Sequence, residues 1–64
     1  MRAKVGDSIV WEEHFDDVQI DLHGIVVKVV SLSFPNRTTK YFVKHGDKED
    51  LWEISEDRIK KIEG

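Results

Sequence analysis

The stretch that decides the fold is "KYFVKHGDKEDLWEI", residues 40–54. Two short runs rich in aromatic and β-branched residues flank the pair Gly46-Asp47. This pattern is typical of two β-strands joined by a tight hairpin turn. The stretch therefore predicts a β-hairpin, and it raises the question of which of its aromatic side chains are buried.

Successive side chains of a strand point to opposite faces of the sheet, so the aromatic residues of this hairpin must divide between core and surface. We expect Tyr41 and Val43 to point inward, together with Trp52 on the second strand. Phe42 and Lys44 then point outward. Phe42 is the aromatic residue of the hairpin that we expect to be exposed.

The preceding sequence contains further strand patterns. "KVGDSIVWEE" alternates apolar and polar residues, and "GIVVKVV" is β-branched almost throughout. We assign Ile9 and Val27 to the core. Gly24 suits a bulge or a bend at which a side chain would collide with its neighbours. The expected strands cover residues 8–12, 19–30, 39–45, 48–54 and 59–62.

The tail "SEDRIKKIEG" is compatible with two structures. Ser55 suits a helix N-cap, and Ile59 and Ile62 are three residues apart, as on one face of a helix. Only about two helical turns would fit, and isolated helices of that length are marginal. We predict a 3₁₀ turn at "SEDR" followed by a last strand, with a short helix as the alternative.

Five short strands in 64 residues favour a small closed barrel, because closure hides the edges of the sheet. "KVGDSIVW", "GIVVKV" and "KYFVKHGDKEDLWEI", followed by "EDRIKKI", resemble the strand order of SH3-like barrels of the KOW and Tudor kind. "AKVGDSIV" and "GIVVKV" are also similar to short bacterial proteins of unknown function such as YkvS. We therefore expect residues 1–64 to form a single all-β domain, a five-stranded SH3-like barrel. The resemblance implies a non-catalytic module that binds proteins or nucleic acids.

The composition narrows the class of protein. The chain has no cysteine, three scattered histidines and a net charge of −3, so neither disulfides nor a structural zinc site of the usual kind is expected to stabilise it. No apolar run approaches the roughly 20 residues that span a bilayer, and "MRAKVGDS" has no secretory signal pattern. We expect a cytoplasmic protein that does not associate with membranes.

Neither catalytic nor cofactor chemistry is indicated. Ser8, Ser31, Ser33 and Ser55 do not lie in a nucleophile elbow, and the four glycines form no phosphate-binding pattern. His14 lies within "EEHFDD", a dense group of potential metal ligands, but this segment lacks the fixed ligand spacing and the glycine of a calcium loop. We therefore expect no enzyme, no cofactor and no metal site, and we interpret this segment as a solvated acidic loop.

Charge is distributed unevenly along the chain. Six acidic residues and no Lys or Arg lie between residues 5 and 27, whereas four bases and no acid lie between residues 28 and 46. One interpretation is attraction between adjoining strands. The other is an interaction surface, because aromatic and arginine side chains are typical of protein interfaces. Its candidate partner-binding residues are Phe34, Arg37, Lys40, Phe42 and Lys44.

Two functions follow from this surface. The first is a protein-protein interaction adaptor or regulator, with another protein as the partner. The second is a KOW-like nucleic-acid binder that uses the basic face of residues 28–44, which the negative net charge and the acidic first loop disfavour. Phe34 has its own alternative, in which it folds back to close one end of the barrel.

Overall fold

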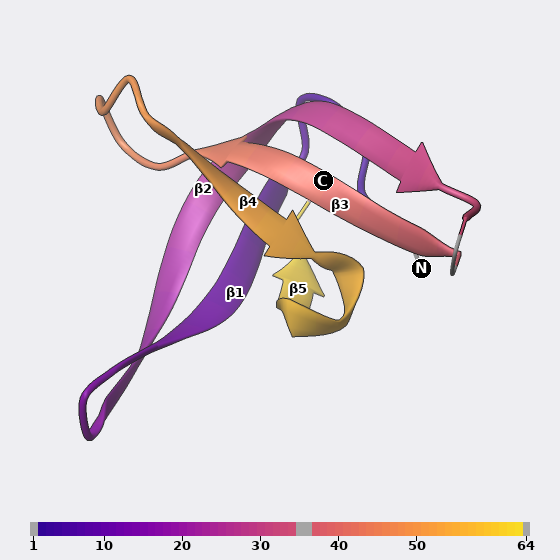
Figure 1. The fold of residues 1–64 in the computed structure, drawn as a ribbon. Coiled ribbons are helices and arrows are strands. Elements are labelled where there is room, and N and C mark those ends of the chain that lie inside the picture. Colours follow the sequence, from indigo (N-terminus) through magenta and orange to yellow (C-terminus); the bar gives the residue numbers. More distant parts are fainter. Residues whose placement is uncertain (1, 35–36, 64) are drawn as a thin grey trace.

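A computed structural model describes residues 2–34 and 37–63 and shows one five-stranded antiparallel sheet (Figure 1). The order across the sheet is β4-β3-β2-β1-β5. The first four strands therefore form consecutive hairpins, and the last strand returns to the free edge of the first. The elements are β1 (Ser8–Phe15), β2 (Val18–Leu32), β3 (Thr38–Lys44), β4 (Leu51–Ser55), the 3₁₀ helix η1 (Glu56–Arg58) and β5 (Ile59–Ile62).

The all-β prediction is confirmed, as is the 3₁₀ turn before the last strand. The alternative of a short C-terminal helix is wrong, because η1 is three residues long and β5 follows it directly. The turn expected in "SLSFPNRTTK" falls between β2 and β3, and its Pro35 and Asn36 lie outside the described residues.

The segment "EEHFDD", residues 12–17, is not a loop over its whole length, contrary to the prediction. β1 and β2 pair without interruption to Phe15 and Val18, which leaves only Asp16 and Asp17 for the turn. Asp16 has a φ of 52°, in the left-handed region that aspartate tolerates better than most residues. Two consecutive aspartates thus allow a tight turn, and the hairpin extends further than the sequence indicated.

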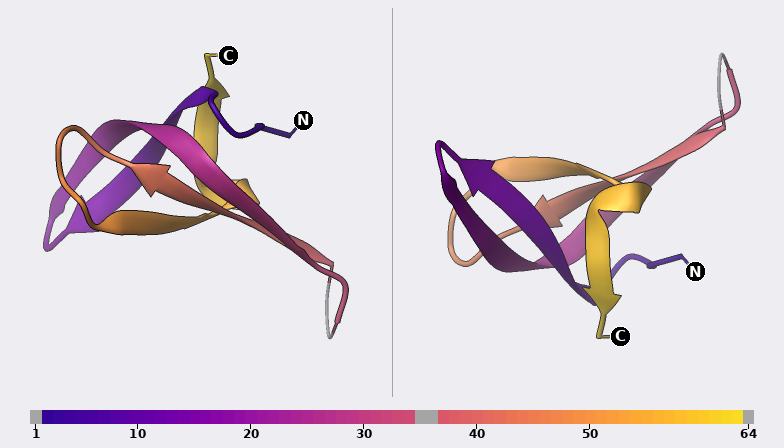
Figure 2. Two further views of the ribbon diagram at one scale, coloured as in Figure 1. Left: turned by 90° about the horizontal axis from the view of Figure 1, so that it is seen from above. Right: turned by 90° about the horizontal axis from the view of Figure 1, so that it is seen from below.

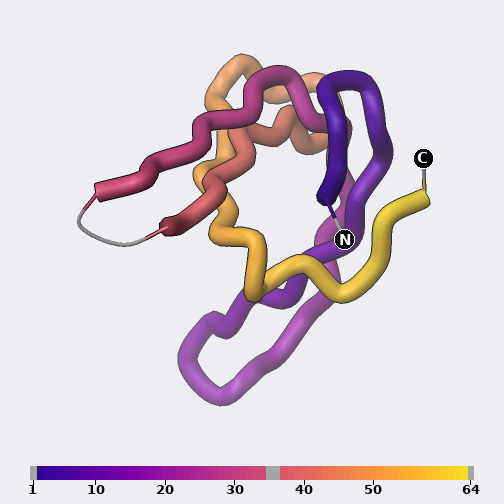
Figure 3. Tube along the Cα trace, turned by 90° about the vertical axis from the view of Figure 1, so that its right-hand side faces the viewer, coloured from indigo at the N-terminus to yellow at the C-terminus, as the bar shows by residue number. Residues whose placement is uncertain are grey.

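The sheet is not closed into a barrel, which corrects the prediction. In the described part of the chain β4 pairs with β3 alone, and β5 pairs with β1 alone. The β1–β5 ladder joins only the segment Ile9–Trp11 to β5 and contains an irregularity in its register. Figure 3 shows the resulting curved, incomplete ring, with η1 passing from one edge strand to the other.

The register of β2 and β3 shifts between Val26 and Lys28, so Val27 is the additional residue of a bulge. Val26 is 1% exposed and Val27 is 40% exposed. The expectation that Val27 belongs to the core is therefore wrong, because one extra residue changes the face to which each following side chain points.

The core lies on the concave side of the curved sheet. Ile9, Tyr41 and Val43 are buried as expected, and Trp52 is half-buried against Trp11, with 5.9 Å between the ring centroids. Strands β1 to β4 provide buried members of this cluster, and Ile59 and Ile62 of β5 are partly buried against it. Its buried members are Ala3, Ile9, Trp11, Val26, Tyr41, Val43 and Ile54.

Gly24 lies on β2 where the core leaves no room for a side chain. A Cβ atom here would be 2.3 Å from Val43 Cγ1, 2.7 Å from the Lys44 carbonyl oxygen and 3.1 Å from Trp11 Cζ3. The close approach predicted for Gly24 is confirmed, although the bulge occurs further along the strand.

Two hairpins extend beyond this core in different directions. Figures 2 and 3 show the ends of the β1–β2 and β2–β3 hairpins projecting separately from the curved sheet. Both contain β2, which at 15 residues is the longest strand. The inner faces of these projecting ends are only partly covered by the rest of the chain.

Candidate functional site

Three of the predicted binding residues lie together on the convex side of the sheet. Lys40, Phe42 and Lys44 alternate along β3 with the buried Tyr41 and Val43. The predicted orientation of this strand is therefore confirmed. These three side chains form the centre of a surface that extends over β2 and β4.

The strand register defines the neighbours of these residues. Phe42 pairs with Lys28 on β2 and Glu53 on β4, and Lys44 pairs with Ile25 and Leu51. We use the term outer face for the residues that this register places on the convex side of β2, β3 and β4. They are Ile25, Lys28, Val30, Leu32, Thr38, Lys40, Phe42, Lys44, Leu51, Glu53 and Ser55.

The outer face combines apolar area with positive charge. Ile25 is 45% exposed and Leu51 is 47% exposed, and both lie beside Lys44. Lys28 Nζ lies 5.9 Å from the centroid of the Phe42 ring, within reach of a cation–π interaction. The face therefore has a half-buried aromatic centre bordered by aliphatic and cationic side chains.

One of the lysines is neutralised locally. Lys40 Nζ lies 2.9 Å from Glu53 Oε1, the only carboxylate of the outer face. Lys28 and Lys44 form no ion pair within residues 2–34 and 37–63. Two positive charges thus remain available to a binding partner.

The other two predicted residues are not on the outer face. Phe34 lies in the segment between β2 and β3 and is 86% exposed, so the alternative in which it folds back to close the molecule is wrong. Arg37 lines a hollow together with Arg2, Ser31 and Thr39. The structure therefore divides the predicted set among the outer face, the end of a hairpin and a hollow.

This hollow has a volume of about 270 Å³ and lies at the end of the β2–β3 hairpin. A second hollow of about 440 Å³ adjoins it and shares Arg37, Thr39 and Glu56 with it. Sequence reasoning missed Arg2 and the hydroxyl residues. The sequence shows that Ser31 and Ser33 are two residues apart and so share one face of a strand. It does not show that Arg2 lies beside them.

Glu56 connects this hollow to Tyr41, whose hydroxyl group donates a hydrogen bond to Glu56 Oε1 at 3.3 Å. Burial of the phenol raises the pKa of Tyr41, and the nearby negative charge of Glu56 raises it further. Arg2 opposes this rise through its positive charge. Arg2 and Glu56 therefore both lie close to the same buried hydroxyl.

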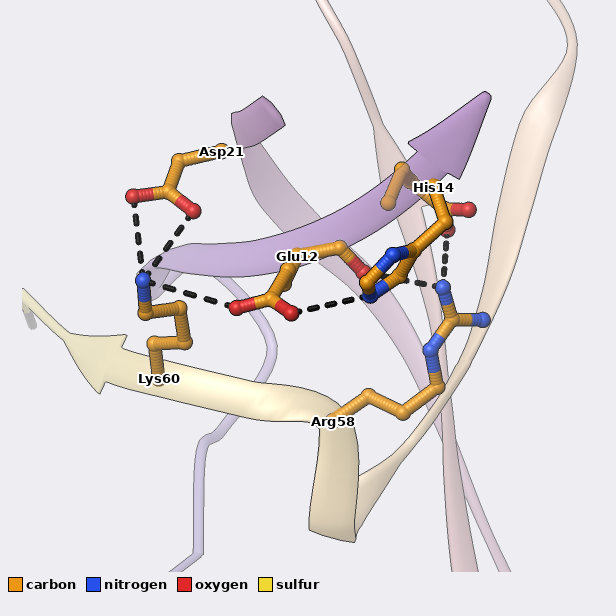
Figure 4. Close-up of polar contacts among 6 residues, drawn as sticks. Glu12, His14, Asp21, Arg58 and Lys60 are labelled. Atoms are coloured by element: carbon orange, nitrogen blue, oxygen red, sulfur yellow. Dashed lines mark hydrogen bonds and ion pairs between the residues drawn. The ribbon is translucent and has the colours of Figure 1, made fainter. Parts of the chain in front are cut away.

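The β1–β2 hairpin, which we call the acidic hairpin, contributes to a network of ion pairs with η1 and β5 (Figure 4). Lys60 Nζ lies 3.1 Å from Asp21 Oδ1 and 3.6 Å from Glu12 Oε2, and its hydrogen bond to Asp21 raises the pKa of Lys60. Glu12 Oε1 is 2.9 Å from Nε2 of His14. Lys60 of β5 thus contacts acidic residues of both β1 and β2, whereas Glu12 and His14 both lie on β1.

Arg58 extends this network around the edge of β1. Its Nη2 donates to the carbonyl oxygen of Glu12 at 2.9 Å and lies 2.6 Å from Glu13 Oε1, to which Trp11 Nε1 also donates at 3.1 Å. The cations that pair with the β1–β2 hairpin therefore come from η1 and β5. The basic segment of residues 28–46 lies farther away, because β5 is the neighbour of β1 in the sheet.

Within the described ranges, no group of three or more His, Cys, Asp or Glu side chains is arranged to hold a metal ion. None of the helical segments in those ranges has the length and hydropathy needed to cross a bilayer.

No protein-family model, curated protein or solved structure matches the chain.

Proposed function

We propose that the protein is a non-catalytic binding module that uses the outer face to dock an acidic segment of another protein. The observation that carries this proposal is the apolar surface on the convex side of the sheet. A sheet with one face on the core normally presents polar residues on the other face. Here Ile25, Leu32 and Leu51 are exposed on that face instead, and Ile25 and Leu51 lie on either side of Lys44.

Charge selects the kind of partner. Lys28 and Lys44 border the apolar area and have no ion-pair partner in the described part of the chain, whereas Lys40 is paired with Glu53. Complementary charge favours the correct partner and accelerates its encounter with the binding surface. An acidic segment with apolar side chains would match both properties of the outer face.

We further infer that the fold is related to SH3-like barrels but has an open sheet. The strand order and the 3₁₀ helix between the last two strands support this relationship. In solution, an open sheet leaves amide groups on the outer edges of β4 and β5 without strand partners. Hydrogen exchange tests this inference, because protection at both edges would indicate a closed barrel.

The binding proposal is tested by charge reversal on the outer face. We expect Lys28→Glu combined with Lys44→Glu to abolish capture of protein partners from a lysate of the native host treated with nuclease. Lys4→Glu combined with Lys61→Glu is the matched control, because it changes the net charge equally at residues outside the outer face. Equal loss of capture in both variants would contradict a specific face.

Two aromatic substitutions separate the outer face from the exposed hairpin end. Phe42→Ala should abolish capture, and Phe34→Ala should leave it intact if the outer face alone is used. Capture that depends on Phe34 would extend the site to the end of the β2–β3 hairpin. Retention of nucleic acid that is lost on nuclease treatment and depends on Lys28 and Lys44 would favour the alternative, a nucleic-acid binder using the basic face of residues 28–44.

A further inference from the structure

We propose that the hollow at the end of the β2–β3 hairpin binds a phosphate monoester, held by the guanidinium groups of Arg2 and Arg37. This site lies beside one end of the outer face, because Leu32 and Thr38 also line the hollow. Register pairs Ser31 with Thr39 on the inner side of the hairpin, whereas Phe42 and Lys44 lie on the convex side. The two proposals therefore depend on different cations, because Lys28, Lys40 and Lys44 do not line the hollow.

The residues around the hollow are suited to an anion with several acceptor oxygens. Two arginines and the hydroxyl groups of Ser31, Ser33 and Thr39 line it. Neither arginine forms an ion pair in the described ranges. Arginine binds phosphate through two parallel hydrogen bonds, and hydroxyl groups can donate to the remaining oxygens. More donors are present than the two oxygens of a carboxylate require.

The size and charge of the hollow restrict the ligand. Its volume of about 270 Å³ is just below the range of about 300–1,000 Å³ that is typical of small-molecule pockets, so it has room for a phosphate group and a small part of the molecule that carries it. Glu56 is the one acidic residue in its lining, and its carboxylate already accepts the hydrogen bond from Tyr41. The two arginines therefore leave the hollow with a positive balance.

The charges of the adjoining hollow determine which end of the site the negatively charged group of the ligand should occupy. It is lined by Asp57 as well as Glu56, and it contains only one of the two arginines. Negative charge should therefore be favoured on the Arg2 side and opposed on the Asp57 side. A phosphate monoester carries a charge of about −1.5 to −2 at neutral pH, so it should respond more strongly to this field than a singly charged phosphodiester does.

The test is a titration of the whole protein with inorganic phosphate, followed by amide chemical shifts and compared with sodium chloride at equal ionic strength. We expect saturable shifts centred on residues 31–33 and 37–39. Arg37→Gln and Arg2→Gln should each weaken binding about tenfold, as expected from the loss of a charge-assisted hydrogen bond. Lys48→Gln, which removes an equal charge in the β3–β4 turn, should leave affinity within twofold of the parent.

Two further variants test the site independently. Asp57→Asn should strengthen phosphate binding, because it removes a repelling charge. If Arg37→Gln does not fold, Arg37→Lys keeps the charge but loses the two-pronged geometry, and it should still weaken binding. Non-saturable shifts, or equal weakening by Lys48→Gln, would overturn the site.

The affinities of different phosphate compounds distinguish a phosphorylated partner from free inorganic phosphate as the ligand. Binding of O-phosphoserine as tightly as inorganic phosphate would indicate a phosphorylated side chain of a partner, whereas preference for inorganic phosphate would indicate the free ion. Dimethyl phosphate and acetate should bind more weakly than both. If dimethyl phosphate binds as tightly as inorganic phosphate, the proposed preference for a monoester is wrong.

Discussion

The two projecting hairpins share β2, yet their inner faces differ in chemistry. On the β1–β2 hairpin the inner face continues the core with Phe15, Val18 and Ile20, all of them exposed. On the β2–β3 hairpin the same side carries the hydroxyl groups of Ser31 and Thr39. Where a hairpin extends past the core, the residue type alone decides whether its inner face becomes an apolar surface or a polar hollow.

The two hairpins also differ in how they are supported. Arg58 and Lys60 hold the β1–β2 hairpin through ion pairs and a backbone hydrogen bond. The β2–β3 hairpin contains a bulge at Val27, and its outer side has one ion pair, between Lys40 and Glu53, in the described ranges. The acidic hairpin should therefore be the more rigid of the two.

The largest effect is expected at Gly24, on the strand that both hairpins share. Gly24→Ala places a methyl group within 2.3 Å of Val43 Cγ1, so we expect the free energy of unfolding to fall by about 3 kcal/mol or the chain to be unfolded. Chemical denaturation measures this loss. Gln19→Ala, at an exposed position of the same strand, should change stability by less than about 0.5 kcal/mol.

The next effect tests the bulge in β2. Val26→Ala should lower the free energy of unfolding by about 2 kcal/mol, because it removes two buried methyl groups and leaves a cavity. Val27→Ala should cost less than about 1 kcal/mol, because Val27 is largely outside the core. Denaturation midpoints of the two variants measure the difference. Equal losses would show that the register shift is absent in solution.

A smaller effect is expected from the support of the acidic hairpin. Arg58→Met removes the contacts with Glu13 and the Glu12 carbonyl, and we expect a loss of about 1 kcal/mol because Arg58 is partly exposed. Amide exchange should accelerate at residues 12–15 and 18–21. Lys40→Met is the control for a surface ion pair and should leave that hairpin unaffected. Uniform acceleration throughout the chain would contradict a local role for Arg58.

The smallest effect concerns the polar hollow of the second hairpin. The pKa of Tyr41 is raised above its ordinary value of 10.0 in the folded protein, first by burial and then by Glu56. Its contribution to stability is therefore complete below pH 10 and is lost as the pH rises through the folded-state value. Tyr41→Phe should weaken the dependence of the urea midpoint on pH above 10. Identical alkaline profiles would contradict this role.

Much of the fold was predictable from local pattern. Alternation placed Tyr41 and Val43 inside and Phe42 outside, and "SEDR" indicated the 3₁₀ turn before the last strand. These features depend on neighbouring residues, so a sequence window contains the necessary information. The same alternation predicted that three residues of the outer face, Lys40, Phe42 and Lys44, lie on one side of β3.

The remaining features depended on contacts between distant segments. The bulge that exposes Val27 arises from pairing with β3, and the sheet is open because its edge strands β4 and β5 do not pair with each other in the described part of the chain. Arg37 lies beside Arg2 because the N-terminal segment passes the β2–β3 hairpin, which no local pattern encodes. The sequence by itself determined the presence of five strands and the two faces of β3, because side-chain alternation is a local property. Only the tertiary structure decided register, closure and the grouping of charges, because these depend on which strands meet.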